Sequence, residues 1–172
     1  GRKTGFKYDA AGRLVEVMDP AGGVWRYAYR ADGALETMTD ANGHVTGFEW
    51  DQAHRLISQT DGEGHVTRFE YDAVGNRVKV IKTDGTVLEY GYDKTDRLVL
   101  VKLPGGGEIT YDFNAADELT EVAFPGGSAQ YAYDNGGRLT KVIQPELGMS
   151  WTYAYDADGL RVSRTAEGGS LG

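Results

Sequence analysis

The stretch FEYDAVGNRV, residues 69–78, contains the pattern that decides the fold. It holds two aromatic residues one position apart, Phe69 and Tyr71, followed by Asp72 and by a turn that includes Gly75. The same kind of aromatic pair recurs along the whole chain. The pairs are Phe6/Tyr8, Tyr27/Tyr29, Phe48/Trp50, Phe69/Tyr71, Tyr90/Tyr92, Tyr111/Phe113, Tyr131/Tyr133 and Tyr153/Tyr155.

The spacing of these pairs is nearly constant. Their second members lie at positions 8, 29, 50, 71, 92, 113, 133 and 155, so five successive differences equal 21 and the last two equal 20 and 22. Sixteen of the 19 aromatic residues belong to the pairs. A fixed period of this length indicates one supersecondary unit repeated in tandem. The chain therefore contains eight repeats, numbered here from 1 to 8 by their aromatic pairs.

Each period carries two turn signals. One follows the second aromatic residue, as in Asp9-Ala10-Ala11-Gly12 and Asp156-Ala157-Asp158-Gly159, and the other lies near mid-period, as in Asp19-Pro20-Ala21-Gly22. Asp can hydrogen-bond the backbone two residues on, and Gly supplies the positive φ that closes a turn. Turns about every 10 residues leave room for two short strands and exclude a helix. The predicted unit is a β-hairpin, and the array is an antiparallel meander of about 16 strands.

Strand parity assigns one face to the aromatic residues. Trp25, Tyr27 and Tyr29 point the same way because residues two apart share a face. The positions inside the pairs are small or charged, as at Lys7 and Glu70, and suit a wetter face. The second strand of most repeats begins with Leu, but its later positions are mixed, so their faces stay unassigned. One hairpin buries too little apolar surface to fold alone, so neighbouring repeats must stack.

The ends of the chain fall inside the repeating pattern. Gly1 and Gly169 occupy the same repeat position, eight full periods apart, and no capping segment is visible. We therefore expect residues 1–172 to be a single uncapped array, a section of a longer one. Uncapped edges also predict edge-to-edge self-association of the isolated chain.

Composition excludes several classes of protein. The chain has no Cys, so it has neither disulfides nor thiolate metal sites, and no apolar run long enough to span a membrane. The net charge of −8 disfavours nucleic-acid binding, which needs a basic groove. Much of the negative excess lies between residues 103 and 137. The simpler interpretation is a solvated face, and the alternative is an acidic surface for a cationic cargo.

The repeat resembles the YD repeat of the bacterial Rhs (rearrangement hotspot) proteins, which also occurs in Tc-toxin components, wall-associated polymorphic toxins and teneurins. The resemblance covers all eight copies, and the close ones are residues 8–14, 71–78 and 155–162. Local departures are Arg30 and Asn114 in place of Asp, and His54, Asp96 and Asp117 in place of the turn Gly. We expect these to distort single turns without changing the architecture.

The resemblance implies an all-β array of hairpin repeats that coils into a hollow shell around a C-terminal toxin domain. It further implies a bacterial secreted or delivered effector, often of type VI secretion, whose partners are the rest of the shell, the enclosed toxin and, through other regions, secretion-apparatus or immunity proteins. The family's Asp-Pro-x-x-Gly-Leu cleavage segment has no match here. The positions expected to carry the repeat structure are Tyr8, Asp9, Gly12, Tyr29, Trp50, Asp51, Tyr71, Asp72, Gly75, Tyr92, Asp93, Phe113, Tyr133, Asp134, Gly137, Tyr155, Asp156 and Gly159.

No motif predicts catalysis, a cofactor or a metal. His44 and His65 lie one period apart and are interpreted as neighbours on the sheet, because no third ligand matches them. Carboxylate pairs such as Glu70/Asp72 recur in repeat register, and Gly105-Gly106-Gly107 is interpreted as a turn because no helix or Gly-Lys-Ser/Thr follows.

The leading hypothesis is therefore a structural, non-enzymatic shell segment. The alternative is an extracellular module that stacks sugars or another ligand on its aromatic ladder. The two differ in whether the paired rings are buried between neighbouring hairpins.

Overall fold

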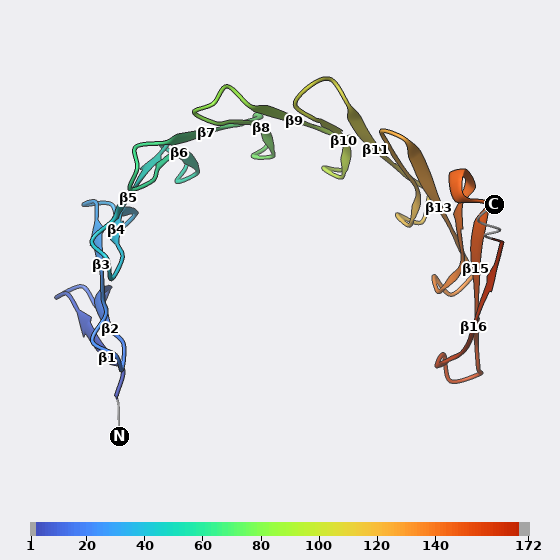
Figure 1. The fold of residues 1–172 in the computed structure, drawn as a ribbon, viewed down its shortest axis with the longest axis horizontal. Helices are drawn as coiled ribbons and strands as arrows, with labels where there is room; N and C mark the ends of the chain where they lie inside the picture. The colour runs from blue at the N-terminus through green and yellow to red at the C-terminus, as the bar shows by residue number, and fades with distance from the viewer. Residues whose placement is uncertain (1–2, 169–172) are drawn as a thin grey trace. The chain divides into compact units, whose positions relative to one another are not determined.

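The computed structural model describes residues 3–168, so Gly1 and Gly169 lie outside the described part. The protein is all-β, as predicted. Sixteen antiparallel strands form one open sheet in which every strand is hydrogen-bonded to its neighbours in sequence, in the order β1 to β16 (Figure 1). Each repeat is a hairpin of one odd-numbered and one even-numbered strand, which confirms the tandem-hairpin architecture.

The chain divides into two compact units. The first ends at Val87 and contains β1 (Gly5–Tyr8), β2 (Leu14–Met18), β3 (Val24–Tyr29), β4 (Leu35–Thr39), β5 (Val45–Trp50), β6 (Leu56–Thr60), β7 (Val66–Tyr71) and β8 (Arg77–Ile81). The second begins at Leu88, within β9 (Val87–Tyr92), and continues with β10 (Leu98–Lys102), β11 (Glu108–Phe113), β12 (Leu119–Phe124), β13 (Gly127–Tyr133), β14 (Leu139–Gln144), the 3₁₀ turn η1 (Pro145–Leu147), β15 (Met149–Tyr155) and β16 (Arg161–Glu167).

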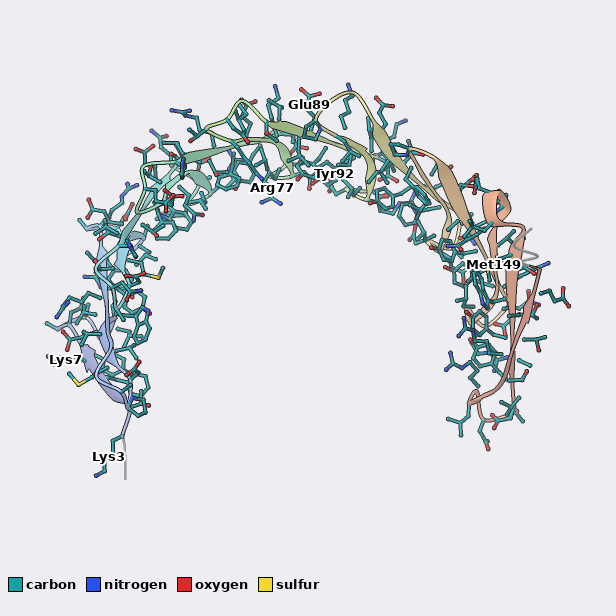
Figure 2. The ribbon with its side chains drawn as sticks, viewed as in Figure 1. Lys3, Lys7, Arg77, Glu89, Tyr92 and Met149 are labelled. Carbon is teal, nitrogen blue, oxygen red and sulfur yellow. The ribbon has the colours of Figure 1, made fainter. Side chains whose placement is uncertain are left out.

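Within each unit the sheet is curved. In the first unit Lys7 lies on the convex face and Arg77 on the concave face (Figure 2). In the second unit Glu89 lies on the convex face and Tyr92 on the concave face (Figure 2). The aromatic pairs therefore line the concave face of each unit, because Tyr92 and the other second aromatics share one strand parity.

The turns have one recurrent geometry. In repeat 1 the Asp9 amide donates to the Arg13 carbonyl at 2.9 Å, the Gly12 amide donates to the Asp9 carbonyl at 3.0 Å, and Gly12 has φ 78°. This is a three-residue hairpin loop that ends in a left-handed residue, which Gly adopts without steric cost. Most mid-period turns repeat the geometry, as at Asp19–Gly23. Both turn signals in the sequence therefore predict the same structure.

A β-bulge in every hairpin assigns the faces that parity alone left open. Tyr8 lies opposite Leu14 but Lys7 lies opposite Glu16, so Val15 is an extra residue and Val17 faces Phe6. The bulge makes residues three apart share a face at this point in the strand. The column that contains Val17, Val80 and Val101 therefore lies on the aromatic face.

The core is thin and runs along this column. Among the described residues, the buried hydrophobic side chains are Val80 and Val101, each 8% exposed, and Ala129, 7% exposed. Val80 is opposite Phe69, and Val101 is opposite Tyr90. The paired rings of repeats 2–8 are half-buried, whereas both rings of repeat 1 are exposed. The rings were expected to be buried between neighbouring hairpins, and in repeats 2–8 they are only partly buried.

Two connections explain why the last two intervals between aromatic pairs depart from the others. Pro125 and Gly126 alone join β12 to β13, where five residues join β10 to β11. Between β14 and β15 the chain instead forms η1, which is followed by Gly148 with φ 58°. The flanking strands are each one residue longer than usual at both places, so the period changes by a single residue.

Candidate functional site

The predicted repeat residues gather along one rim of the sheet. This first rim consists of the turns that join each odd-numbered strand to the next strand, residues 9–13, 30–34, 51–55, 72–76, 93–97, 114–118, 134–138 and 156–160. The second rim consists of the mid-period turns at the opposite ends of the strands. Every odd-numbered strand ends at its second aromatic residue, and these residues are Tyr8, Tyr29, Trp50, Tyr71, Tyr92, Phe113, Tyr133 and Tyr155.

Each turn of the first rim is capped by a side chain near its start. In repeat 3, Asp51 Oδ1 accepts from the amides of Ala53 at 2.8 Å and Arg55 at 2.9 Å. Asp9, Asp72, Asp93, Asp134 and Asp156 accept equivalent bonds, and Asn114 does so through its amide oxygen. In repeat 2, where Arg30 leads the turn, Asp32 Oδ1 accepts from the Ala34 amide at 3.1 Å. These side chains satisfy donors that a tight loop leaves unpaired.

The substituted turns keep their geometry, so the expected distortion is wrong. His54, Asp96 and Asp117 have φ of 57°, 61° and 62°, in the same left-handed region as Gly75 and Gly159 at 108° and 80°. The His54 amide still donates to the Asp51 carbonyl at 3.1 Å. Asp tolerates this region better than most side chains, and the ladder on both sides holds the backbone in place.

An arginine in the turn connects one repeat to the next. Arg55 Nε donates to Asp51 Oδ2 at 2.7 Å, and Arg55 Nη1 donates to the Asp72 carbonyl of repeat 4 at 3.1 Å. The guanidinium also lies 4.9 Å from the centre of the Tyr71 ring. Arg55 therefore contacts its own turn, the next turn and the next aromatic ring. We call this contact of a turn arginine with its own Asp and the next ring the clamp.

The clamp is also present in repeats 1, 5 and 7. Arg13 lies over Tyr29 at 4.9 Å, Arg97 over Phe113 at 4.7 Å and Arg138 over Tyr155 at 5.1 Å. Each of these arginines donates from Nε to the Asp of its own turn, at 2.7 Å. A cation over an aromatic face is worth about 0.5–1 kcal/mol at an exposed site. These arginines are not among the residues predicted from the sequence, although the pattern Asp-x-x-x-Arg-Leu at residues 9–14, 51–56, 93–98 and 134–139 signals them.

The second aromatic residue provides another connection between repeats. The Tyr71 hydroxyl donates to the Leu56 carbonyl of repeat 3 at 2.8 Å, and Tyr29, Tyr133 and Tyr155 make the same bond to Leu14, Leu119 and Leu139. In repeat 3 the second aromatic residue is Trp50, and its indole N–H donates to the Leu35 carbonyl at 2.6 Å. The bond satisfies a carbonyl next to the bulge, which explains why an aromatic residue with a polar tip recurs here.

The turn carboxylates are held in the charged form. The Arg13 amide, followed by its guanidinium, lowers the pKa of Asp9 below its usual range, and the same two groups of Arg138 lower the pKa of Asp134. The Arg55 amide lowers the pKa of Asp51 against the opposing effect of burial. These carboxylates are bound as charged acceptors at both the backbone and the guanidinium.

The second rim holds the two repeated histidines, each bonded to the Asp of its own turn. His44 Nδ1 is 3.0 Å from Asp40 Oδ2, and His65 Nδ1 is 3.1 Å from Asp61 Oδ2. The hydrogen bond to Asp40 raises the pKa of His44. A Cβ on Gly62 would lie 2.7 Å from the Cβ of His44, so the loop of one repeat packs against the next. Among residues 3–168 no group of three potential metal ligands occurs.

The other candidate groups are spread apart. Glu49 and Glu70 lie on the convex side, opposite Ser58 and Lys79, whereas Asp51 and Asp72 cap turns of the first rim. Gly105, Gly106 and Gly107 belong to a mid-period turn in which the Gly106 amide donates to the Leu103 carbonyl at 3.2 Å.

The acidic residues between positions 103 and 137 are divided between the sheet and the first rim. Asp112 lies opposite Glu121 on the convex side. In contrast, Asp117 pairs with Arg97 and Asp134 with Arg138. Part of the negative excess therefore stabilises the first rim. No helix in the described part has the length and apolarity to cross a membrane.

The chain matches the RHS Repeat family over residues 8–45, 31–66, 50–87, 71–108, 113–147 and 133–171. Its fold is similar to that of TcdB2-TccC3 without the hypervariable C-terminal region, with 18% identity, a TM-score of 0.79, and coverage of 92% of this chain and 10% of that chain. It is also similar to TcdB2-TccC3-Cdc42, with 18% identity, a TM-score of 0.77, and coverage of 90% of this chain and 10% of that chain.

A third similar structure is a Tc holotoxin pore of Photorhabdus luminescens, with 16% identity, a TM-score of 0.70, and coverage of 94% of this chain and 12% of that chain. No curated protein matches the chain. The chain thus spans about a tenth of the length of the solved structures it resembles. The family matches extend over most of its length, in register with the observed hairpins, and the chain belongs to the RHS repeat family.

Proposed function

We propose that this chain is a section of the wall of a repeat shell that encloses a C-terminal toxin domain for delivery from a bacterium. The observation that carries the proposal is the placement of the chemically distinctive side chains. Arg55, Asp51 and Tyr71 contact one another across a repeat junction and are used to hold hairpins together. The role is structural and non-enzymatic, because the polar groups of the rim satisfy turns and carbonyls.

The sheet suits a wall because of its two faces. The concave face of each unit carries the aromatic rings, which are half-buried in repeats 2–8, and the convex face carries charged side chains such as Lys7 and Glu89 (Figure 2). On the convex face Lys7 Nζ is 2.7 Å from Glu16 Oε1, and Lys102 Nζ is 3.6 Å from Glu89 Oε2. Sheets commonly have one face packed and one face solvated, so this division supports an inside and an outside. The remaining repeats of the shell and the enclosed domain are the partners.

Protection of the cargo tests the proposal. In the intact protein, the C-terminal domain should resist trypsin under native conditions and become sensitive when the shell is unfolded, whereas the same domain made alone should be cut at once. Equal cleavage rates for the enclosed and isolated domains would refute enclosure. A coding region with no folded domain after the repeats would refute it as well. Delivery by type VI secretion is tested separately, by loss of export when the secretion sheath is deleted.

The carbohydrate-binding alternative is not favoured by the exposure of the rings. Those of Tyr29, Tyr71 and Tyr155 are half-buried, and each has a guanidinium over its face where a sugar would stack. Glycan-array binding that disappears on substitution of a ring residue would revive it. Tyr131→Ala tests this with least damage, because Tyr131 occupies the first aromatic position and the bond that joins repeats comes from the second.

A further inference from the structure

The strand β16 departs from the other even-numbered strands on its concave side. In repeats 1–7 the residue opposite the first aromatic is uncharged, and these residues are Val17, Met38, Gln59, Val80, Val101, Val122 and Val142. In repeat 8 the same position, opposite Tyr153, holds Arg164. The residue opposite the second aromatic is Leu in six repeats and Arg77 in repeat 4, and in repeat 8 it is Arg161. Two cations therefore occupy the concave side of β16.

These two arginines lie over rings of β15 but have no counter-charge. The guanidinium of Arg161 is 5.8 Å from the centre of the Tyr153 ring, and that of Arg164 is 5.8 Å from the centre of the Trp151 ring. No carboxylate among residues 3–168 forms an ion pair with either arginine. The clamp arginines differ in this respect, because each donates to the Asp of its own turn.

The backbone of β16 has a free edge in the part of the chain that the structure describes. All its residues are exposed, and β15 is its one neighbouring strand among residues 3–168. Hydrogen-bonded and non-hydrogen-bonded pairs alternate along an antiparallel ladder, so the amides of Arg164 and Ala166 point to this edge. Unpaired amide and carbonyl groups in a row are a template for an added strand.

The other junctions show where an added strand would lie. Val17 is opposite Trp25 at the junction of repeats 1 and 2, and Val142 is opposite Trp151 at the junction of repeats 7 and 8. In the same antiparallel register, an added strand places one residue opposite Arg164, here called position x. Position x+2 lies on the same face, displaced toward Arg161.

An added strand would remove much of the water around Arg164. The equivalent side chain of Val101, which has β9 on one side and β11 on the other, is 8% exposed. Burial suits a valine, but a guanidinium that loses water without an opposing charge destabilises the pairing. A carboxylate at position x offsets this cost, because it accepts charge-assisted hydrogen bonds from the guanidinium.

The strands of this chain do not have a carboxylate at position x. At the junctions within each unit the residues in this position are Trp25, Thr46, Thr67, Ile109, Ala129 and Trp151. A second copy of the chain would place Thr4 opposite Arg164, because Thr4 is two residues before Phe6 as Trp25 is two before Tyr27. The strand that fits β16 best therefore differs from every strand described in this chain.

We propose that the edge of β16 binds an extended acidic segment of a partner as an added strand, with carboxylates at x and x+2 that face Arg164 and Arg161. In this mode of recognition the main-chain hydrogen bonds supply affinity, and the alternate side chains supply selectivity. The inference concerns what adjoins β16, and it holds whatever the wall encloses.

A decapeptide in which Thr and Glu alternate tests the proposal on the 172-residue chain. All its carboxylates lie on one face of an extended strand, and the same peptide with Gln in place of Glu is the matched control. At low salt the Glu peptide should bind about fivefold more tightly, since each of two exposed ion pairs contributes a few-fold. The chain has a net charge of −8, so general attraction would favour the neutral peptide instead. Equal affinities, or tighter binding of the Gln peptide, would overturn the proposal.

Two double variants identify the arginines as the cause. Arg161→Leu with Arg164→Val gives β16 the side chains usual in the other repeats and should remove the preference for the Glu peptide. Arg68→Val with Lys141→Val removes the same charge from the convex side, opposite Ser58 and Ala132, and should leave the preference unchanged. A preference that survives the first variant, or disappears in the second, would overturn the proposal.

Hydrogen exchange locates the added strand. The Glu peptide should slow exchange of the Arg164 and Ala166 amides and leave β1, the opposite edge of the described sheet, unchanged. Equal slowing at both edges would show that any free edge binds the peptide, which contradicts the selectivity proposed here. Light scattering at high concentration compares the peptide with a second copy of the chain. Oligomers that grow equally well in saturating peptide would show that the copy is preferred, and would also overturn the proposal.

Discussion

At turns of the first rim that carry the clamp, one carboxylate serves the backbone and the guanidinium together. Asp9 Oδ1 accepts from the Ala11 and Arg13 amides, both at 2.9 Å, while Oδ2 accepts from Arg13 Nε at 2.7 Å. Protonation removes the charge from both sets of bonds. The turn residues should therefore make the stability of the array sensitive to acid.

The first prediction concerns this acid sensitivity. The pKa values of Asp9, Asp51 and Asp134 are lowered in the folded chain, so their contribution is complete above the unfolded value, about 3.9, and is lost as pH falls through the folded values. The urea midpoint should fall steadily below about pH 4. The triple variant Asp9→Asn, Asp51→Asn, Asp134→Asn should be less stable at pH 7 and show a flatter acid slope. An unchanged slope would exclude these carboxylates as the cause.

The second prediction concerns the backbone of a substituted turn. His54 has φ 57°, where a Cβ costs about 1–2 kcal/mol that Gly does not incur. His54→Gly should raise the free energy of unfolding by about 1 kcal/mol, after allowing for the greater freedom of Gly in the unfolded chain. His54→Ala is the control and should give no such gain, since Ala keeps the Cβ. Urea denaturation at pH 7 measures both.

At the scale of the strand and its neighbour, the third prediction concerns the hydroxyl bond between repeats. Tyr71→Phe leaves the Leu56 carbonyl without its donor at 2.8 Å, and it should lower the free energy of unfolding by about 1 kcal/mol. Tyr131→Phe removes a hydroxyl from the same face at the first aromatic position and should change stability little. Thermal and urea unfolding of the two variants provide the comparison; equal losses would show that the bond to the carbonyl is not the cause.

The reverse substitution tests the same bond by adding a hydroxyl where the chain has none. Phe113 occupies the second aromatic position of repeat 6 and lies under the Arg97 guanidinium, but it has no hydroxyl for the carbonyl of Leu98. Phe113→Tyr should place a donor there and raise the free energy of unfolding by about 0.5–1 kcal/mol. A destabilised variant would indicate that the hydroxyl does not reach the carbonyl in this repeat.

Hairpins, turns and the aromatic face could be predicted because each depends on residues close in sequence. Asp72 and Gly75 specify a turn locally, and Phe69 and Tyr71 share a face by parity. The bulge at Val78 could not be predicted, because an extra residue becomes visible only when Glu70 is seen opposite Lys79. The face of the sheet on which Val80 lies could therefore be assigned only from the observed register.

The clamp could have been found from its sequence spacing but not from the single repeat. Arg55 touches Tyr71 only when two hairpins lie side by side, so its role belongs to the junction. A single motif for all the copies does not separate Gly12-Arg13-Leu14 from Gly75-Asn76-Arg77-Val78, in which the arginine is one position later. Arg77 lies over Phe69 of its own repeat, at 5.7 Å.

At the scale of the whole molecule, the first and last strands of the sheet, β1 and β16, each have one neighbouring strand among residues 3–168. In β1 the Phe6 and Tyr8 rings are 56% and 61% exposed, whereas the equivalent rings of repeats 2–8 are half-buried. All residues of β16 are exposed as well. A strand at the edge of a sheet offers amide and carbonyl groups to any chain that can pair with it.

The last prediction follows from these two edges. β16 of one molecule can pair with β1 of another in the same way as successive repeats pair within the sheet. Because the two edges are different surfaces, this pairing is head-to-tail and leaves a free edge at each end. The isolated chain should therefore form oligomers that grow with concentration. Light scattering should show a mass that rises with concentration. Hydrogen-bonded and non-hydrogen-bonded pairs alternate along an antiparallel ladder, so the Ala166 amide, opposite Trp151, points to the free edge of β16. Ala166→Pro removes this donor and should reduce the growth, while Thr152→Pro, within the paired strand β15, should instead destabilise the fold. A constant monomer mass at high concentration would refute edge pairing, because the exposed rings of β1 and the edge of β16 would then tolerate solvent without a partner.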